Sequence, residues 1–213
     1  MGRAELARLG VRSIPVLTQG ERYVFGQSLA DIVRFLGLAE HAGPTLPVSE
    51  LIARLDRALG LARDLIGQMP DALLAREVPN RPRSYRVLAH HIFRIPEAFL
   101  ETAAGTTLTA TSASAPPPEE MVGTAEIVAY GENVRRRLGS WWDAEADRSG
   151  ARTVATYYGA QSLHEVLERT TWHSMQHVRQ WEMLLDMAGI APMARLSPEA
   201  CAGLPMPKEV WDS

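Results

Sequence analysis

The chain has 213 residues, 46% of them hydrophobic and 22% charged, and a formal net charge of −3, a composition that is typical of globular proteins and excludes extensive disorder. The mild acidity disfavours nucleic acid as a partner, since a phosphate-binding face needs a basic excess, and the single cysteine, Cys201, excludes an internal disulfide or a CxxC site. No apolar run approaches the roughly 20 residues of a bilayer span and no signal-peptide pattern begins the chain, so a cytoplasmic protein without a membrane partner is expected.

Residues 1–40 have the pattern of a small α/β segment. Short runs on either side of Gly20 predict a β-hairpin, and Ser28 and Asp31 form a variant of the capping box that begins a helix. The predicted elements, in order, are the end of a helix over residues 4–9, a strand over 13–18, a strand over 22–25 and a helix over 29–38. Residues 39–47, which are rich in Gly and Pro, are the predicted linker.

Residues 48–190 predict a four-helix bundle, because apolar side chains recur there at three- and four-residue steps. The predicted helices span residues 49–69, 84–103, 124–146 and 163–188. The last helix begins at a capping box formed by Ser162 and Glu165. Residues 104–120, rich in Thr, Ser and Pro, are the predicted long crossover loop, and residues 191–213 are a C-terminal tail. The expected fold class is mainly α, a bundle preceded by a small α/β segment.

Three of the six histidines point to a metal site. His173 and His177 lie four positions apart on the last predicted helix, so their side chains share one face. His91 lies on the apolar face of the second predicted helix, and pairing of these two helices would bring three imidazoles together. Three His ligands with an open position are typical of a catalytic divalent-metal site. His90 points about 100° away from His91 on the helix and is the second choice as a ligand.

The alternative is that these histidines are ordinary core or surface residues. An HxxxH pair is common on helices that bind no metal. The position of His91 on an inward face favours the metal interpretation, because each buried neutral imidazole needs partners for both of its ring nitrogens.

Two motifs carry a family resemblance, namely Ser84-Tyr-Arg-Val-Leu-Ala-His-His91 in the second predicted helix and Trp172-His-Ser-Met-Gln-His177 in the fourth. With them, residues 49–189 resemble the DinB-like four-helix-bundle superfamily, which includes mycothiol-dependent maleylpyruvate isomerase and bacillithiol transferases. The resemblance implies that His91, His173 and His177 hold a divalent ion, zinc or nickel, and that a long loop joins the second and third helices. It indicates the site better than the substrate, because the members of the family differ in activity.

The first segment carries a second resemblance. Ser13-Ile14-Pro15-Val16, with the hairpin and helix that follow, resembles the second half of a glutaredoxin- or thioredoxin-like domain, in which such a proline is cis and borders the thiol site. The CxxC half of that fold is missing, so either the native start codon lies upstream or the segment is a remnant that packs on the bundle or on another chain. The simpler interpretation is that Pro15 is a turn residue. Half a sheet has open edges, which favour a homodimer or a docked partner.

These features favour a divalent-metal-dependent enzyme, either a low-molecular-weight thiol S-transferase or a hydrolase, in which the metal lowers the pKa of a bound thiol or water. Its partners would be a small-molecule thiol or an electrophile. Arg169 and Gln180, about one turn from the predicted ligands, are the candidates for binding a substrate carboxylate or orienting water. Glu165 and Glu168 are general-base candidates if they reach the site. The alternative function is a non-catalytic metal- or redox-responsive binding module that works through dimerisation.

Overall fold

The computed structural model describes residues 6–11, 15–39, 43–79 and 81–211, and four long helices make up most of it. They are α3 (Val48–Gly67), α4 (Tyr85–Ala103), α6 (Thr124–Ala144) and α7 (Leu163–Met187). The short helices are η1 (Asp71–Leu73), α5 (Ala110–Ala113) and α8 (Pro198–Cys201). The prediction of a mainly α fold built on a four-helix bundle is confirmed. Among the helices of the described residues, none is both long and apolar enough to cross a bilayer.

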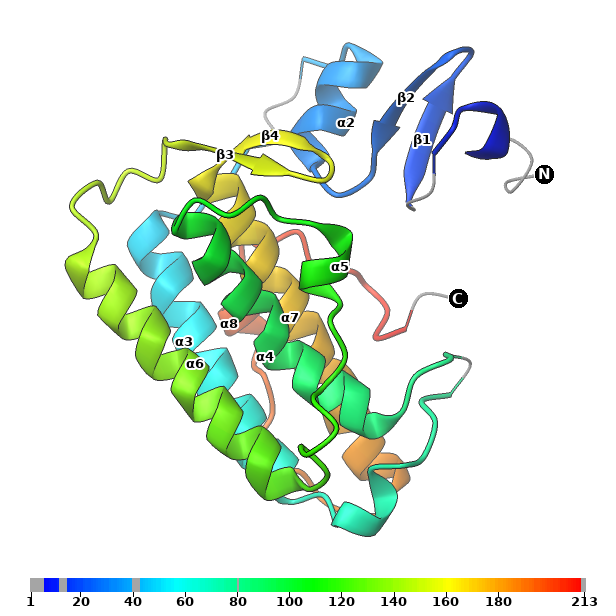
Figure 1. The fold of residues 1–213 in the computed structure, drawn as a ribbon, viewed down its shortest axis with the longest axis vertical. Helices are drawn as coiled ribbons and strands as arrows, with labels where there is room; N and C mark the ends of the chain where they lie inside the picture. The colour runs from blue at the N-terminus through cyan, green and yellow to red at the C-terminus, as the bar shows by residue number, and fades with distance from the viewer. Residues whose placement is uncertain (1–5, 12–14, 40–42, 80, 212–213) are drawn as a thin grey trace.

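The four long helices form a square in which α3 and α4 lie diagonally opposite each other. Each of these two packs on both α6 and α7. In Figure 1, α3 and α7 run away from the blue N-terminal segment, whereas α4 and α6 run toward it. Because α4 and α6 are therefore parallel neighbours, the chain between them returns along the bundle, which explains the long crossover loop predicted there. This loop also contains α5, which the sequence pattern did not predict.

The core lies between the four helices and is made of apolar side chains. Phe93 of α4 and Trp181 of α7 are among the largest side chains that are fully buried. The ring of Phe93 packs against Gly131 of α6, where an added Cβ would lie only 2.4 Å from a ring carbon. Close packing of α4 on α6 therefore requires glycine at this position, although glycine is a poor helix former.

An N-terminal segment lies beyond one end of the bundle (Figure 1). It consists of strands β1 (Val16–Gln19) and β2 (Arg22–Phe25), which pair antiparallel, and helix α2 (Leu29–Leu36). Ser28 caps α2 as predicted, because its hydroxyl accepts a hydrogen bond from the backbone N–H of Asp31. The carboxylate of Asp31 in turn accepts a hydrogen bond from Gln161, which ties the segment to the rest of the protein.

Two expectations for this segment lie partly outside the described residues. Residues 13 and 14, the start of the strand predicted over 13–18, are outside them, as are residues 4 and 5 of the helix predicted over 4–9. The strands and the helix that follow have the predicted order. The glutaredoxin- or thioredoxin-like interpretation of the segment stays a prediction.

A second hairpin, which the sequence pattern did not predict, precedes α7. Its strands β3 (Thr153–Thr156) and β4 (Gly159–Ser162) pair antiparallel. Each strand has only four residues, and its small side chains show no clear hydrophobic alternation, so neither strand has a recognisable sequence pattern. The hairpin leads directly into α7, where Ser162 and Glu165 form the predicted capping box.

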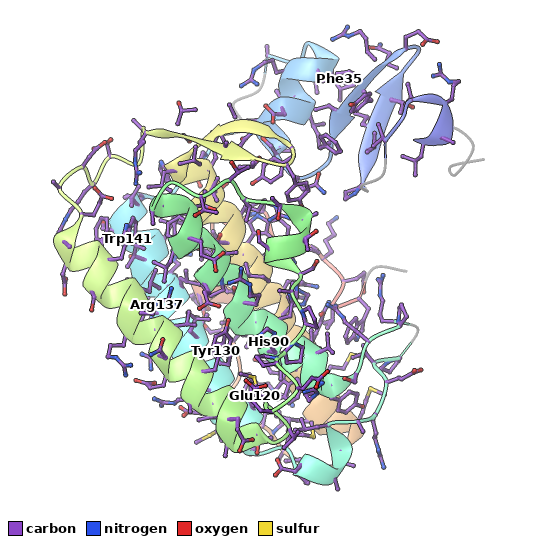
Figure 2. The ribbon with its side chains drawn as sticks, viewed as in Figure 1. Phe35, His90, Glu120, Tyr130, Arg137 and Trp141 are labelled. Carbon is purple, nitrogen blue, oxygen red and sulfur yellow. The ribbon has the colours of Figure 1, made fainter. Side chains whose placement is uncertain are left out.

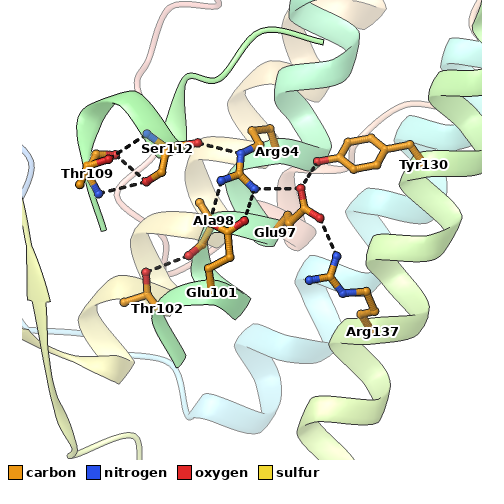
Figure 3. A network of polar contacts seen from close by, with 9 residues as sticks. All are labelled: Arg94, Glu97, Ala98, Glu101, Thr102, Thr109, Ser112, Tyr130 and Arg137. Atoms are coloured by element: carbon orange, nitrogen blue, oxygen red, sulfur yellow. Dashed lines mark hydrogen bonds and ion pairs between the residues drawn. The ribbon is translucent and has the colours of Figure 1, made fainter. Parts of the chain in front are cut away.

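A network of ion pairs and hydrogen bonds around Arg94 connects α4 with the crossover loop (Figure 3). Arg94, whose side chain is 9% exposed, donates hydrogen bonds to Glu97 and, through two nitrogens, to Glu101. Its Nε also donates to the backbone carbonyl of Ser112 in α5 at 2.7 Å. The guanidinium therefore holds α5 against α4.

Glu97 extends the same network to α6. Its carboxylate accepts hydrogen bonds from the hydroxyl of Tyr130 and from the guanidinium of Arg137 (Figure 3). The ring of Tyr130 also stacks on His90, with centroids 4.9 Å apart (Figure 2). The second-choice histidine is thus part of the α4–α6 interface.

We expect Glu97→Gln to lower the free energy of unfolding by about 1–3 kcal/mol at neutral pH, because Arg94 then loses a charged partner. Burial would raise the pKa of Glu97, but hydrogen bonds from Tyr130, Arg137 and Arg94 outweigh burial and hold this pKa below its ordinary value. Because folding lowers this pKa, the ionised Glu97 stabilises the folded protein at pH values above the unfolded-state pKa of about 4.3. That stabilisation is lost as the pH falls through the folded-state pKa. Urea unfolding measured at several pH values should show that the difference in unfolding free energy between Glu97→Gln and the unaltered protein becomes smaller below about pH 4.

Glu119→Gln is the matched control, because Glu119 is exposed and its substitution removes the same charge. We expect little change in its unfolding at any pH. A difference between Glu97→Gln and the unaltered protein that stays constant down to about pH 3 would contradict the role of the Glu97 charge.

Candidate metal centre

Helices α4 and α7 bring His91, His173 and His177 together. Their candidate ligand nitrogens all lie within 4.8 Å of one another. The ring centroids are 4.8 Å apart for His173 and His177, 4.9 Å for His91 and His177, and 5.7 Å for His91 and His173. His177 is buried, and the other two are partly exposed. Three nitrogen donors therefore converge on a volume of the size of one ion.

Pro96 leaves a backbone carbonyl of α4 free for a hydrogen bond to α7 next to this group. Proline has no N–H, so it cannot donate the helical hydrogen bond to the carbonyl of Ile92 one turn earlier. The buried hydroxyl of Ser174 donates to that carbonyl instead, at 3.3 Å. Since Ile92 follows His91 and Ser174 follows His173 in the chain, this bond holds the two histidines in register across the interface.

Gln180 orients the ring of His177. Nδ1 of His177 lies 2.7 Å from Oε1 of Gln180, and Nε2 of Gln180 donates to the carbonyl of Val210 at 3.0 Å. Because the amide nitrogen faces a carbonyl, the amide oxygen must face the imidazole, and Nδ1 must carry the proton. Nε2 of His177 therefore keeps its lone pair. Metal-binding histidines are usually held in this way by a hydrogen bond from the other ring nitrogen.

Two nitrogens of the group are buried without a hydrogen-bond partner in the part of the chain that the structure describes, namely Nδ1 of His173 and Nε2 of His177. An unpaired buried polar atom is costly, and a divalent ion between the rings would satisfy both. Burial lowers the pKa of all three histidines, that of His91 to about 3, and the positive charge of Arg83 lowers them further. The imidazoles are therefore neutral at neutral pH, the form that binds metal. Such nitrogen donors fit zinc or nickel.

We expect Gln180→Ala to weaken zinc binding about 10- to 100-fold, the usual cost of losing the group that orients a metal ligand. Gln180→Glu keeps an acceptor for the Nδ1–H of His177, so it should retain most of the affinity. Competition with a chelator of known affinity measures both variants. Equal zinc affinity in Gln180→Ala and the unaltered protein would show that Gln180 does not orient the ring.

Arg169, the other predicted catalytic candidate, lies one turn before His173 on α7. Its guanidinium carbon lies 5.4 Å from the centroid of the Tyr158 ring, and one terminal nitrogen lies 3.4 Å from the hydroxyl of Tyr157. Its Nε is buried and has no hydrogen-bond partner among the described residues. The structure thus places both candidates beside the histidines, Gln180 through a hydrogen bond and Arg169 in the wall of the cavities described next.

Two cavities meet at the histidine group. The larger, of about 530 Å³, is here called the polar cavity, and its lining includes Pro15, Gly26, Arg83, His91, Tyr157, Arg169, His173, His177 and Gln180. The smaller, of about 220 Å³, is called the apolar cavity, and its lining includes His91, Ile95, Phe99, Leu108, Ala113, Tyr157, Arg169 and His173. Both therefore give a small molecule access to the same two histidines, His91 and His173.

Arg83 and Tyr157 also line this site, although neither is among the site residues predicted from the sequence. Arg83 lies in the connection just before Ser84, the N-cap of α4, and Tyr157 lies in the turn between β3 and β4. Neither residue belongs to a helical pattern, so no spacing in the sequence points from it to the histidines. The place of each residue in the site depends on how these connections pack against α4 and α7.

The remaining candidates lie elsewhere. His90 stacks on Tyr130 and is not part of the three-histidine group. The carboxylate of Glu165 accepts hydrogen bonds within its capping box, and Glu165 and Glu168 line another cavity, of about 230 Å³. Cys201 is partly buried in α8, and burial raises the pKa of its thiol. None of these supplies a ligand or a base to the histidine group in the part of the chain that the structure describes.

Comparisons with known proteins agree with this fold. The chain is similar to a solved structure described as "YfiT from Bacillus subtilis is a probable metal-dependent hydrolase with an unusual four-helix bundle topology", at 15% identity, with a TM-score of 0.50 and coverage of 68% of this chain and 89% of that one. At this identity the likeness concerns the fold alone. No match was found among curated proteins. A family model of the DinB superfamily matches residues 30–181, and the chain therefore belongs to the DinB superfamily.

Proposed function

We propose that the protein is a divalent-metal-dependent enzyme whose ligands are His91, His173 and His177, and that hydrolysis is its activity. The observation that carries this proposal is the pair of buried ligand nitrogens without partners at the meeting point of two cavities. A purely structural site is closed by a fourth protein ligand, whereas no further His, Cys, Asp or Glu joins these three within the described residues. The description of YfiT as a probable metal-dependent hydrolase supports the same reaction class.

Each residue of the site has a separate role in this proposal. A bound zinc or nickel ion would supply a Lewis acid that lowers the pKa of water. Gln180 holds His177 in the tautomer whose Nε2 is free to bind. Arg169 binds an anionic group of the substrate or orients water, because its Nε is free and it lines both cavities.

A second candidate reaction is the transfer of a low-molecular-weight thiol to an electrophile. Two observations favour it. The polar cavity, at about 530 Å³, is much larger than a water molecule requires. Its wall also includes Pro15, which belongs to the segment that resembles half of a thioredoxin-like domain.

Metal-loaded protein tests both reactions. Protein freed of metal is reloaded with zinc, nickel or manganese, then assayed for hydrolysis of p-nitrophenyl acetate and for conjugation of cysteine with 1-chloro-2,4-dinitrobenzene. We expect metal-dependent turnover in at least one assay, and its loss in His177→Ala. His164→Ala is the matched control, because His164 lies on the same helix and its ring contacts the carbonyl of Leu46 instead of the cluster. Stoichiometric metal without turnover would favour the alternative of a non-catalytic metal-responsive module.

The proposal also covers organisation and location. We propose a partial α/β segment over residues 1–40, a bundle over 48–190 and a tail over 191–213, in a cytoplasmic homodimer. The open edges of the β1–β2 sheet and the exposed side chains of Tyr23 and Leu29 support dimerisation. Size-exclusion chromatography with light scattering at micromolar concentration tests it, and a monomeric mass would contradict it.

A further inference from the structure

Arg83 is a partly buried cation that has no acidic partner among the described residues. It lines the polar cavity, and it makes no side-chain hydrogen bond or ion pair in the part of the chain that the structure describes. Burial and the nearby charge of Arg81 both lower its pKa, so its surroundings disfavour the charged form. A guanidinium stays charged at neutral pH, and Arg83 is therefore held beside the histidines at a cost in stability.

Arg169 faces the same cavity in a similar state. Its neighbours are the rings of Tyr157 and Tyr158, its Nε is buried without a partner, and no carboxylate pairs with it among the described residues. Two other arginines that are at least partly buried, by contrast, have carboxylate partners. Arg94 contacts two glutamates, and Arg135 contacts Asp56 through two nitrogens.

The lining of the polar cavity has no negative charge to balance these guanidinium groups. It includes arginines, histidines, glutamines and aromatic side chains, and no Asp or Glu among the described residues. A divalent ion bound by the three histidines would add two positive charges to the same lining. Two donor forks of this kind match the oxygens of a carboxylate or a phosphate.

The apolar cavity shares His91, Tyr157, Arg169 and His173 with the polar cavity. The side chains of Ile95, Phe99 and Leu108 line it, and α5 of the crossover loop completes its wall. A molecule that occupies both cavities would therefore place an apolar group among these side chains, an anionic group beside the arginines of the polar cavity, and other atoms near His91 and His173.

We propose that Arg83 and Arg169 form an anion-binding subsite, and that the substrate is an organic carboxylate or phosphate whose apolar substituent occupies the apolar cavity. The term substrate rests on the proposed function, whereas binding of the anion does not. Arg83 and Arg169 are binding residues here, and the histidines remain the metal ligands.

Calorimetric titration with four simple probes tests this subsite in the full-length protein. The probes are 4-phenylbutyrate, 4-phenylbutan-1-ol, which lacks the charge, butyrate, which lacks the apolar group, and phenyl phosphate. Each is titrated into zinc-loaded protein and into protein stripped with a chelator, so that a carboxylate bound to metal is distinguished from one bound to arginine. We expect 4-phenylbutyrate to bind at least tenfold more tightly than the alcohol and than butyrate in both forms. The ratio of phenyl phosphate to 4-phenylbutyrate affinity distinguishes the two anion classes.

Arg83→Gln and Arg169→Gln should each weaken 4-phenylbutyrate binding about 10- to 100-fold, the size expected for charged hydrogen bonds, and leave binding of the alcohol unchanged. Arg136→Gln is the matched control, because Arg136 is exposed on α6 and its substitution removes the same charge from outside the cavity. The affinity of this variant for 4-phenylbutyrate should stay within about twofold of that of the unaltered protein, since distant surface charges are screened. The melting temperature of Arg83→Gln should not fall, which separates a binding role from a structural one.

Equal affinity for the acid and the alcohol, or equal losses in Arg83→Gln and Arg136→Gln, would overturn the subsite. Zinc binding without selective binding of the anion would overturn this inference and leave the proposed metal-dependent function in place. Selective binding of the anion in a protein that takes up neither zinc, nickel nor manganese would support the subsite and overturn the proposed function.

Discussion

Replacement of His177 with alanine should weaken zinc binding by more than a hundredfold. His177 is the most buried member of the group, and its unprotonated Nε2 has no hydrogen-bond partner among the described residues. Loss of a residue that only orients a ligand costs about 10- to 100-fold, so loss of the ligand itself should cost more. Competition with a chelator gives the affinity, and mass spectrometry of protein purified without added metal gives the stoichiometry.

The same comparison has a thermal readout. A metal that binds only the folded state stabilises it by about 4 kcal/mol at a concentration 1,000 times its Kd. Zinc should therefore raise the melting temperature of the unaltered protein and of His164→Ala, and leave that of His177→Ala nearly unchanged. One zinc per chain retained by His177→Ala after extensive dialysis would rule out the three-histidine site.

Replacement of Phe93 with alanine should lower the free energy of unfolding by about 3–5 kcal/mol, the range for truncation of a buried phenylalanine. The side chain is fully buried between α4 and α6 and lies edge-on to Tyr130, with ring centroids 6.3 Å apart. Domains of this size have total stabilities of about 5–15 kcal/mol, so the variant should be close to unfolding at 37 °C. Urea unfolding followed by circular dichroism measures the loss.

Gly131 provides a test of the same contact from the other side. Gly131→Ala should also destabilise the protein, by about 1–3 kcal/mol, because its Cβ would overlap the Phe93 ring. In a Phe93→Leu background this penalty should become smaller, and the gain of about 1 kcal/mol in helix propensity should emerge. Additive effects of the two substitutions would contradict direct packing of Phe93 on Gly131.

The sequence by itself determined the helices and part of the site. Apolar residues at three- and four-residue steps predict α3, α4, α6 and α7, because a helix places such residues on one face whatever it packs against. The same local geometry places His173 and His177 on one face. Ser28 and Ser162 could be recognised as caps, because a cap acts on a backbone N–H within three residues. The hairpin of β3 and β4 lacked such a signal, since its strands are short and made mostly of small side chains.

Only the tertiary structure decided which of these faces meet. The parallel pairing of α4 with α6, the hydrogen bond from Ser174 to Ile92 and the approach of Phe93 to Gly131 join residues far apart in the chain. The positions of Arg83 and Tyr157 in the polar cavity likewise depend on connections that have no periodic pattern. Interactions within one helix repeat at known spacings, whereas contacts between elements arise from packing, whose partners a single sequence does not identify.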